Sequence, residues 1–412
     1  MHEFKYRSKN LYCEGVKIAD LAERFGTTLY VYSYKTLIDH YLKLKSAFRK
    51  VNPLICYSVK ANSNLAILKA LVAKGAGLDI VSGGELSRAL CAGCPAEKIV
   101  YASVGKTDTE ITAALSKGIL FFNAESLSEL ENINRIAKKL KKIARVAIRI
   151  NPDVETKTHK YIATGKITNK FGIDLDSAYK ILLLRFRFTN LNICGLHIHI
   201  GSQITKSEPF VAAIKKVTNS IRRLQDKAVA LEYLNIGGGL GIIYDRETPQ
   251  TAQVYADKII PFLEKTGLKI IMEPGRFIVG NAGILVTKVL YIKNTPQKKF
   301  IIVDSGMNDL IRPSLYSAYH NILALSMVGG TEKADVVGPI CESGDFFAKE
   351  RIVPKVKKGD YLAIMSAGAY GFSMSSNYNS RPRSAEILVR DNKVCVIRKR
   401  ETFSDLIRNE KD

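Results

Sequence analysis

The sequence of 412 residues predicts a (β/α)8 barrel of the TIM type and a C-terminal β-sandwich or β-barrel domain. Short apolar runs rich in β-branched residues recur between residues 54 and 272 with helical patterns between them, and after residue 281 they continue without helices. Eight strands that alternate with helices over about 240 residues are typical of such a barrel. The predicted barrel strands are Leu54–Tyr57, Leu78–Val81, Ile99–Tyr101, Ile119–Phe122, Arg145–Ile150, Ile193–Ile200, Tyr233–Ile236 and Lys269–Met272.

The segments between these strands carry helix signals. Leu65, Leu68 and Leu71 recur at helical spacing and share one face. Thr107–Glu110 and Ser126–Glu129 have the sequence pattern of capping boxes, in which the cap and the third helical residue satisfy each other's backbone amides. Helices are therefore predicted to begin directly after Thr107 and Ser126.

The β domain is predicted to take a strand from the N-terminal segment. Leu29–Tyr32 precedes the barrel and has the composition of a strand. We therefore predict three parts: residues 1–33 joining the β domain, residues 34–280 as the barrel, and residues 281–412 as the β domain. The predicted strands of this domain are Gly283–Ile292, Lys299–Val303, Ala334–Val337, Asp360–Met365, Ser384–Val389 and Lys393–Ile397.

The composition indicates an ordinary globular protein, with 46% hydrophobic and 25% charged residues. No run of 18 apolar residues is present, so no membrane span is predicted, and the N-terminus lacks the apolar core of a signal peptide. Seven cysteines, an odd number and thinly spread, favour a reducing compartment. The sequence therefore predicts a cytoplasmic location.

The formal net charge of +23 raises the alternative of a nucleic-acid partner. The basic residues are dispersed, however, mostly at helical spacing, and no zinc-finger spacing or aromatic RNA-binding pattern accompanies them. Solvated helix faces explain the charge better, and we predict no nucleic-acid partner.

Candidate functional residues follow most of the predicted barrel strands, at the rim where such barrels carry their active sites. Lys60 follows the first strand, His199 closes the sixth, the triple glycine Gly237, Gly238 and Gly239 follows the seventh, and Glu273 follows the eighth. A phosphate cradle after the seventh and eighth strands is common in this fold.

These residues are the parts needed to hold pyridoxal phosphate. A lysine forms a Schiff base with the cofactor aldehyde, backbone amides of a glycine turn bind its phosphate, and an acid keeps its pyridine nitrogen protonated. Lys60, the glycine turn and Glu273 supply these groups, and Arg276 offers a clamp for a carboxylate or a phosphate. A solvated lysine is the alternative for Lys60 taken alone.

Three further residues leave alternatives open. Asp79 ends the second strand inside the barrel and could form an ion pair with Lys60 or Arg149. The pair would be either structural or functional, because a charge inside the barrel is costly unless it is paired. His197 and His199 alternate onto one strand face, so His199 suits stacking on a pyridine ring. Two inward histidines also suggest a metal, but no carboxylate cluster has ligand spacing, and no metal is predicted.

The β domain and one long loop add candidates. Cys341 is a buried apolar filler or a thiol proton donor, and Tyr370 stands between glycines that allow close approach to a ligand. The polar stretch Ser375–Arg383 is a rim loop or an interface, and Thr156–Gly172 reads as a functional loop on the catalytic rim.

As a set, these motifs resemble the fold-type III pyridoxal-phosphate decarboxylases with an alanine racemase-like barrel, and within them the diaminopimelate decarboxylases. The resemblance runs from about residue 10 to 405; the family's usual extra glycine is missing from Ala102–Lys106. The motifs are Tyr57–Asn62, Asp79–Glu85, Thr158–Gly165 with Lys170–Gly172, His199–Gln203, Gly237–Gly239, Glu273–Arg276, Arg312–Tyr316, Cys341–Asp345 and the segment from Tyr370.

The resemblance implies decarboxylation of meso-2,6-diaminopimelate to L-lysine and carbon dioxide. It implies that Lys60 carries the cofactor, Glu273 faces the pyridine nitrogen, His199 stacks on the ring and Cys341 reprotonates the α-carbon. It also places Asp79, Ser202, Gly275, Arg276 and Tyr370 with the glycine turn in the cofactor site.

The distal centre of the substrate carries its own amine and carboxylate. By the resemblance, Arg276, Arg312 and Tyr316 bind the distal carboxylate and Glu342 binds the distal amine. The resemblance also makes Tyr370 a substrate-binding residue. The resemblance further implies a homodimer in which Lys60 of one chain faces Cys341 and Glu342 of the other. The alternatives are an ornithine or arginine decarboxylase, whose substrate lacks the distal carboxylate, and a non-catalytic pyridoxal-phosphate carrier.

Overall fold

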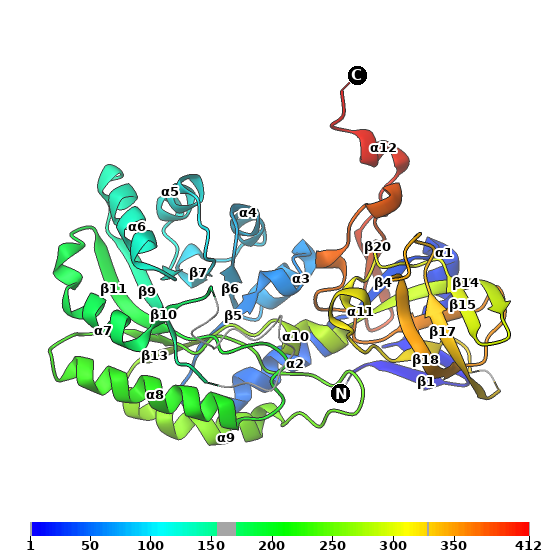
Figure 1. Cartoon of the computed structure of the whole chain (residues 1–412), viewed down its shortest axis with the longest axis horizontal. Helices are drawn as coiled ribbons and strands as arrows, with labels where there is room; N and C mark the ends of the chain where they lie inside the picture. Colours follow the sequence, from blue (N-terminus) through cyan, green and yellow to red (C-terminus); the bar gives the residue numbers. More distant parts are fainter. Residues whose placement is uncertain (1, 155–169, 328, 412) are drawn as a thin grey trace. The chain divides into compact units, whose positions relative to one another are not determined.

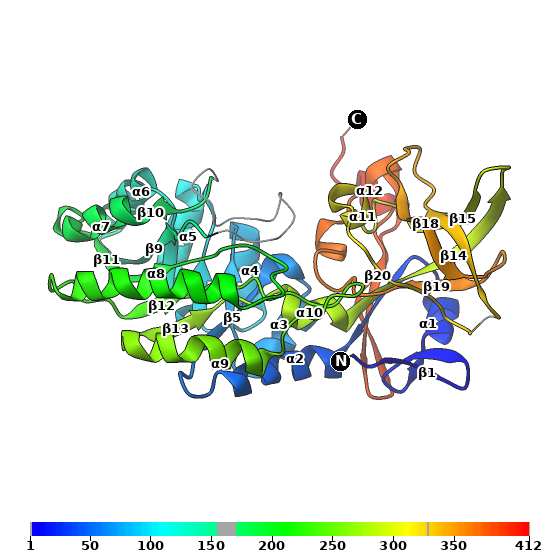
Figure 2. The same cartoon turned by 60° about the horizontal axis from the view of Figure 1, so that its bottom comes forward.

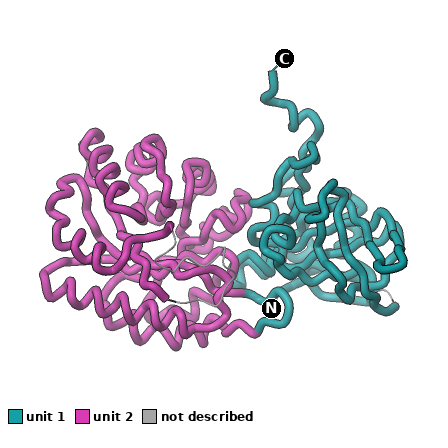
Figure 3. The backbone as a smooth tube through the Cα atoms, in the orientation of Figure 1, with its two compact units in different colours: residues 1–40, 242–247, 278–412 teal, residues 41–241, 248–277 magenta. Residues whose placement is uncertain are grey.

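A computed structural model of the protein describes residues 2–154, 170–327 and 329–411, and the chain forms two compact units. One unit comprises residues 41–241 and 248–277, and the other comprises residues 1–40, 242–247 and 278–412 (Figure 3). The domain boundaries at residues 33 and 280 stay a prediction. Most of the predicted loop Thr156–Gly172, including Thr158–Gly165, lies outside the described residues.

The unit of residues 41–241 and 248–277, magenta in Figure 3, is a closed barrel of eight parallel strands, as predicted. Closure comes from two pairings, β13 with β5 and β8 with β9. A short extra strand, β10 (Ile173–Asp174), extends β9. The barrel strands are β5 (Leu54–Ser58), β6 (Gly77–Ile80), β7 (Ile99–Tyr101), β8 (Phe121–Ala124), β9 (Ala144–Asn151), β11 (Leu191–His197), β12 (Tyr233–Asn235) and β13 (Lys269–Met272).

Helices follow the barrel strands, and α8 and α9 lie side by side along one flank (Figures 1 and 2). The helices are α2 (Tyr34–Ala47), which begins in the other unit, α3 (Leu65–Val72), α4 (Gly83–Cys91), α5 (Asp108–Lys117), α6 (Leu127–Lys139), α7 (Leu175–Leu183), α8 (Glu208–Gln225), α9 (Ala252–Leu263) and α10 (Arg276–Val279).

The predicted capping boxes have different outcomes. Thr107 and Glu110 form a complete box at the start of α5. At α6, Ser126 accepts from the amide of Glu129, but the Glu129 carboxylate accepts from the amide of Glu125 and from Lys106. The second box was therefore wrong in its reciprocal half, because a buried lysine and a rim amide compete for the glutamate.

Apolar side chains of the barrel strands form a buried cluster. Cys56, Val100, Phe121, Ala147 and Ile271 are fully buried and form one cluster. Burying a large apolar side chain stabilises a fold by about 1.5–3 kcal/mol. This packing fixes the strand ends from which the polar rim residues extend.

The other unit, teal in Figure 3, is a β domain that takes in a strand from the N-terminal segment, as predicted. β4 (Leu29–Ser33) lies between β14 and β20, antiparallel to the first and parallel to the second. All five residues of β4 are buried, which explains why an apolar run far from the domain in sequence completes its sheet.

The remaining elements of this unit include strands that the sequence did not reveal. The unpredicted strands are β1 (Phe4–Arg7), β2 (Asn10–Cys13), β3 (Val16–Lys17), β16 (Ile322–Ala324) and β18 (Phe346–Pro354). The other elements are α1 (Ile18–Phe25), β14 (Gly283–Asn294), β15 (Lys299–Val303), α11 (Arg312–Tyr316), β17 (Thr331–Val337), β19 (Tyr361–Ile364), β20 (Ala385–Arg390), β21 (Lys393–Arg398) and α12 (Phe403–Ile407). Among the helices of the described ranges, none is both long and apolar enough to cross a membrane.

Candidate active site

Lys60 extends from the turn that follows the first barrel strand, β5. Its Nζ lies 2.5 Å from Oδ2 of Asp79, and the hydroxyl of Ser58 donates to the same oxygen at 2.7 Å. The side chain of Asp79 is fully buried, whereas that of Lys60 is 37% exposed. The structure thus selects Lys60 over Arg149 as the partner of Asp79, and it anchors an accessible amine on a buried carboxyl group.

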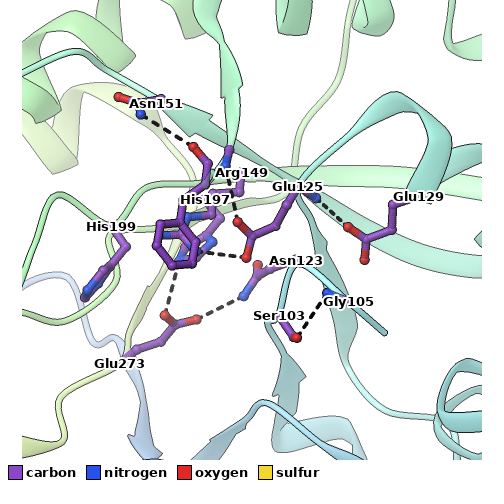
Figure 4. A network of polar contacts seen from close by, with 12 residues as sticks. Ser103, Gly105, Asn123, Glu125, Glu129, Arg149, Asn151, His197, His199 and Glu273 are labelled. Carbon is purple, nitrogen blue, oxygen red and sulfur yellow. Dashed lines mark hydrogen bonds and ion pairs between the residues drawn. The ribbon is translucent and has the colours of Figure 1, made fainter. Parts of the chain in front are cut away.

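Glu273, directly after β13, sits among three donors from three other strands. Its Oε1 accepts from Nδ2 of Asn235 at 2.6 Å and from Nδ2 of Asn123 at 3.0 Å. Its Oε2 lies 3.1 Å from Nε2 of His197. Figure 4 shows Asn123 of β8 and His197 of β11 pointing toward Glu273, and Asn235 reaches the same carboxylate from β12.

The two buried carboxyl groups of the barrel differ in protonation. Burial raises the pKa of Asp79, Glu273 raises it further, and Lys60 offsets only part of the increase. Burial also acts to raise the pKa of Glu273, but His197, the charge of Lys60 and Asn235 outweigh it and hold that pKa well below its usual range. Glu273 is therefore a fixed negative charge inside the barrel.

His199 lies beyond the end of its strand. The predicted strand Ile193–Ile200 was too long: β11 ends at His197, and His199 belongs to the rim loop that follows. Nδ1 of His199 accepts from the amide of Gly238 at 3.3 Å. Burial, Arg149 and Lys60 lower the pKa of His199 to about 3, so its ring is neutral at physiological pH.

The glycine turn after β12 is built from backbone that packs on backbone. A Cβ on Gly237 would lie 2.4 Å from the carbonyl oxygen of Ile198, and one on Gly239 would lie 2.3 Å from that of Gly201. Gly237 and Gly239 also have positive φ values of 66° and 105°, which favour glycine. The amide of Gly237 already donates to Oδ1 of Asn235 at 2.9 Å, so this amide is less suited to a phosphate than predicted.

The segment after Glu273 is joined to the turn that carries Lys60. The amide of Ser58 donates to the carbonyl of Pro274 at 3.1 Å. A Cβ on Gly275 would lie 2.9 Å from Cβ of Ala61. Arg276 then begins α10 and donates to the hydroxyl of Ser202 at 3.2 Å. This packing makes Gly275 a requirement of the site's shape.

A second layer of buried ion pairs supports the rim. Arg149 pairs with Glu125 at 2.8 Å, and the other oxygen of Glu125 accepts from the amide of Gly172 at 3.2 Å. The buried amine of Lys106 contacts the carboxylate of Glu129 at 2.6 Å and the backbone carbonyl of Asn123 at 2.8 Å. Lys106, from the segment that departs from the family pattern, thus holds the strand end that presents Asn123 to Glu273.

In the β domain, Arg312 is held by aromatic side chains of its own unit. Its Nη1 lies 2.8 Å from Nε2 of His320, and Nδ1 of His320 lies 2.7 Å from the carbonyl of Met365. The guanidinium also lies 4.6 Å from the ring centroid of Tyr244. Because its Nδ1 must donate to the carbonyl, His320 accepts at Nε2 and fixes the direction of Arg312.

Cys341 and Glu342 are exposed, and both are contacted from one loop. Sγ of Cys341 lies 3.6 Å from Oδ1 of Asn379, and the hydroxyl of Tyr378 hydrogen-bonds to the carboxylate of Glu342. Exposure of Cys341 excludes, within this chain, the alternative of a buried apolar filler.

The structure brings the candidates together in two groups, each within its own unit. The barrel group consists of Lys60, Asp79, His199, Ser202, Gly237, Gly238, Gly239, Glu273, Gly275 and Arg276. The β-domain group consists of Arg312, Tyr316, Cys341, Glu342 and Tyr370. Tyr316 ends α11, and Tyr370 has a positive φ of 56°.

Several residues of these networks were missed or received no role from the sequence. Asn235 gave a usable signal, since strand alternation and its place before the glycine turn put it at the rim. Asn123 stands directly after the predicted strand Ile119–Phe122, but no sequence pattern connected it to Glu273. His320 received no role. Tyr378 and Asn379 were noticed only as part of the polar stretch Ser375–Arg383, because their partners Glu342 and Cys341 are distant in the chain.

Pyridoxal phosphate fits the barrel group. Lys60 offers an accessible amine, Glu273 offers a buried anion for the ring nitrogen, and Gly237–Gly239 form a turn without side chains. Around Lys60 and Glu273, some buried polar atoms also have no hydrogen-bond partner among the described residues, including Oδ1 of Asp79, Oδ1 of Asn123 and Nδ1 of His197. Buried polar atoms are rarely left unpaired, so their presence favours a site shaped for a polar ligand.

Gly238→Ala tests the glycine turn. A Cβ at this position would lie 2.1 Å from the carbonyl oxygen of Glu273, so the backbone must shift. Overpacking of this kind costs about 1–3 kcal/mol, and we expect cofactor binding to weaken about tenfold or more. Titration of the apoprotein with pyridoxal phosphate measures this. Gly105→Ala is the control, since no atom lies within 4 Å of its added Cβ; equal binding by both variants would contradict the role of the turn.

Comparison with known proteins agrees with this site. A family model for the pyridoxal-binding domain of pyridoxal-dependent decarboxylases matches residues 34–280. The chain is similar to diaminopimelate decarboxylase of Aquifex aeolicus, with 51% identity over 98% of this chain and 96% of the relative. It is also similar to that of Neisseria meningitidis serogroup B, with 47% identity over 97% of each chain.

The fold agrees over the same extent. The crystal structure of diaminopimelate decarboxylase from Helicobacter pylori, complexed with L-lysine, superposes with a TM-score of 0.93 and 43% identity, covering 96% of this chain and 99% of that one. The catalytic roles of individual residues stay predictions. From the pyridoxal-binding domain through the β domain, the chain belongs to the pyridoxal-dependent decarboxylases, and within them to the diaminopimelate decarboxylase family.

Proposed function

We propose that the protein decarboxylates meso-2,6-diaminopimelate at its D-centre and releases L-lysine and carbon dioxide, the last step in making lysine. The observation that carries this proposal is the barrel rim, where the accessible amine of Lys60 and the buried anion Glu273 stand on strands paired side by side, β5 and β13. The full-length similarity to diaminopimelate decarboxylases supports the choice of substrate.

In this proposal the amine of Lys60 would hold pyridoxal phosphate at the barrel rim. The bound cofactor supplies an electron sink for the charge left when carbon dioxide departs. Glu273 keeps the pyridine nitrogen protonated, because its own pKa lies well below the usual range. His199, whose ring is neutral, packs on the cofactor face without adding a charge. Asp79 keeps the amine of Lys60 in place.

The phosphate is proposed to lie at the glycine turn. Gly238 and Gly239 expose backbone there, and Arg276 with its partner Ser202 supplies a cation and a hydroxyl. Tyr370 of the β domain is proposed to contact the cofactor and the substrate. These contacts orient the cofactor without taking part in bond breaking.

The distal centre of the substrate is proposed to bind by charge. Arg276 and Arg312, helped by Tyr316, take the distal carboxylate, and Glu342 takes the distal ammonium. Arg312 is already directed by His320 at 2.8 Å, and Glu342 by Tyr378. A charged side chain that is already oriented loses less conformational entropy on binding a ligand than a freely rotating one.

We further propose a homodimer in which Cys341 and Glu342 act at the site of the other chain. Both side chains are exposed, which suits residues that act at an interface. The Cys341 thiol would return a proton to the α-carbon. A cytoplasmic location is proposed as well, and the seven unpaired cysteines support it.

Turnover tests the proposed function. The purified protein loaded with pyridoxal phosphate is given meso-diaminopimelate, ornithine or arginine, and carbon dioxide and amino-acid products are measured. We expect L-lysine from meso-diaminopimelate and little release from the other two. Preferential release from ornithine or arginine would assign the chain to the alternative decarboxylases, and release from none would reduce it to a cofactor carrier.

Arg312 and Glu342 are expected to set selectivity, and D-lysine separates their roles because it has the distal amine but lacks the distal carboxylate. Arg312→Met should lower kcat/KM for meso-diaminopimelate by about 30-fold or more, since losing one partner of a buried charge pair costs about 2–5 kcal/mol. It should leave D-lysine unaffected. Glu342→Gln should lower kcat/KM for both substrates.

The control for these variants is Arg390→Met, at an exposed position on β20. It should match the wild type with both substrates. An Arg312→Met enzyme that keeps its preference for meso-diaminopimelate over D-lysine would remove Arg312 from the distal site.

A further inference from the structure

The barrel contains three polar side chains that all hydrogen-bond to Glu273. Asn123 comes from β8, His197 from β11 and Asn235 from β12, while Glu273 follows β13. The two asparagines are fully buried, and His197 and Glu273 are only 1% and 5% exposed. Three strands and the segment after a fourth therefore each place one side chain in the same buried network, of which Figure 4 shows Asn123, His197 and Glu273.

Counting acceptor sites shows what this network leaves open. A carboxylate offers about four lone-pair directions, two on each oxygen. The described residues fill three of them: two asparagine amides donate to Oε1, and the His197 imidazole donates to Oε2. One direction remains, and it is on Oε2.

The direction of two of the three donors is fixed by neighbouring contacts. Oδ1 of Asn235 accepts from the amide of Gly237 at 2.9 Å, so its NH2 group must face Glu273. The backbone carbonyl of Asn123 is held by Lys106 at 2.8 Å. Nε2 of His197 faces a carboxylate oxygen and must therefore carry a proton. Asn235 and His197 therefore face Glu273 with donors of fixed direction, and Asn123 donates to it through Nδ2.

We propose that His197, Asn123 and Asn235 are positioning residues that hold Glu273 ionised and leave one acceptor direction, on the oxygen that His197 binds, for the protonated ring nitrogen of the cofactor. This rests on the proposed function, because it assumes that pyridoxal phosphate binds with its ring nitrogen at Glu273. The set acts through Glu273 and makes no bond to the reacting atoms.

A comparison within the same barrel supports the assignment. Asp79 is as buried as Glu273, and it contacts the cation of Lys60 at 2.5 Å and one hydroxyl. Even so, burial and the neighbouring Glu273 raise its pKa. A carboxyl group in this interior is therefore not ionised by default. His197, the nearby charge of Lys60 and Asn235 favour the charge on Glu273, and Asn123 adds a third hydrogen-bond donor.

The test substitutes the donor on the oxygen that retains the open direction. His197→Leu removes the donor at similar volume, His197→Gln restores an N–H group, and Asn123→Ala removes a donor from the other oxygen. Each variant is loaded with pyridoxal phosphate labelled with 15N in the ring. The 15N chemical shift reports directly whether the ring nitrogen is protonated, without any substrate.

We expect a shift close to that of a pyridinium in the wild type and a shift toward neutral pyridine in His197→Leu. Loss of one hydrogen bond to a charged group corresponds to about a 10- to 100-fold change, so kcat should fall by that factor while KM changes little. His197→Gln should recover most of both signals. Asn132→Ala, on the outer helix α6, is the control and should leave the 15N shift unchanged.

The outcomes separate this proposal from the proposed function. An unchanged 15N shift in His197→Leu and Asn123→Ala, with normal turnover, would overturn the positioning set and leave the decarboxylase intact. A wild type that binds no cofactor would overturn both. If His197→Leu fails to fold, Asn123→Ala still decides, since an unchanged 15N shift in that variant would contradict the proposal.

Discussion

Lys60→Ala should lose covalently bound pyridoxal phosphate and its visible absorption, and kcat should fall by at least about 10³-fold, within the range for loss of a group that moves protons in catalysis. The amine of Lys60 is accessible at the rim, and its partner Asp79 is buried. No substitute is expected from Lys106, whose amine already has three partners.

The fold should survive this substitution. Removing Lys60 leaves Asp79 with the hydroxyl of Ser58 at 2.7 Å. Burial already raises the pKa of Asp79, so without the lysine this group can take up a proton instead of remaining a buried charge. Circular dichroism and Tm measure the fold, and Lys74→Ala at an exposed site is the control. A Lys60→Ala protein that keeps the absorption and the turnover would contradict the assignment.

Mixing two inactive variants should restore activity if the sites are shared between chains. Lys60→Ala and Cys341→Ala are each expected to be nearly inactive. When their subunits exchange freely, about half of the dimers are mixed, and two-fold symmetry puts both defects in one site and none in the other. About a quarter of all sites should then work.

The control for this experiment pairs two barrel variants, Lys60→Ala and His199→Ala. Both residues lie in the barrel unit, so every site of the mixed dimer has one defect and no activity should return. Subunit exchange is checked by mass spectrometry with differently tagged chains. Lack of recovery for Lys60→Ala with Cys341→Ala, despite complete exchange, would mean that each site is built within one chain.

The barrel could be predicted from the sequence because its signals are local. Each strand is a short apolar run such as Ile99–Tyr101 or Lys269–Met272, and the structure has both with these bounds. The end of β11 was missed by contrast, since Ile198 and Ile200 continue the apolar pattern where the chain already turns. β18 (Phe346–Pro354) was missed because charged residues interrupt its apolar pattern.

Site residues were predictable where one residue carries the chemistry, and not where the chemistry depends on distant partners. Lys60, His199 and Glu273 stand at strand ends, where the fold alone makes them conspicuous. The contact between Asn123 and Glu273 joins residues 150 positions apart, and Arg312 depends on the tautomer of His320. Such pairings follow from strand order and register in three dimensions, which no local pattern encodes.

The central claim is that Lys60 carries pyridoxal phosphate and gives it up to meso-diaminopimelate. Borohydride reduction followed by peptide mapping tests this in one measurement, because it fixes the cofactor to whichever amine holds it. We predict a pyridoxyl group on the peptide that contains Lys60 in the resting protein, and its loss when reduction follows addition of meso-diaminopimelate but not of ornithine. A pyridoxyl group on another lysine, or a label on Lys60 that ornithine removes and meso-diaminopimelate does not, would contradict the account.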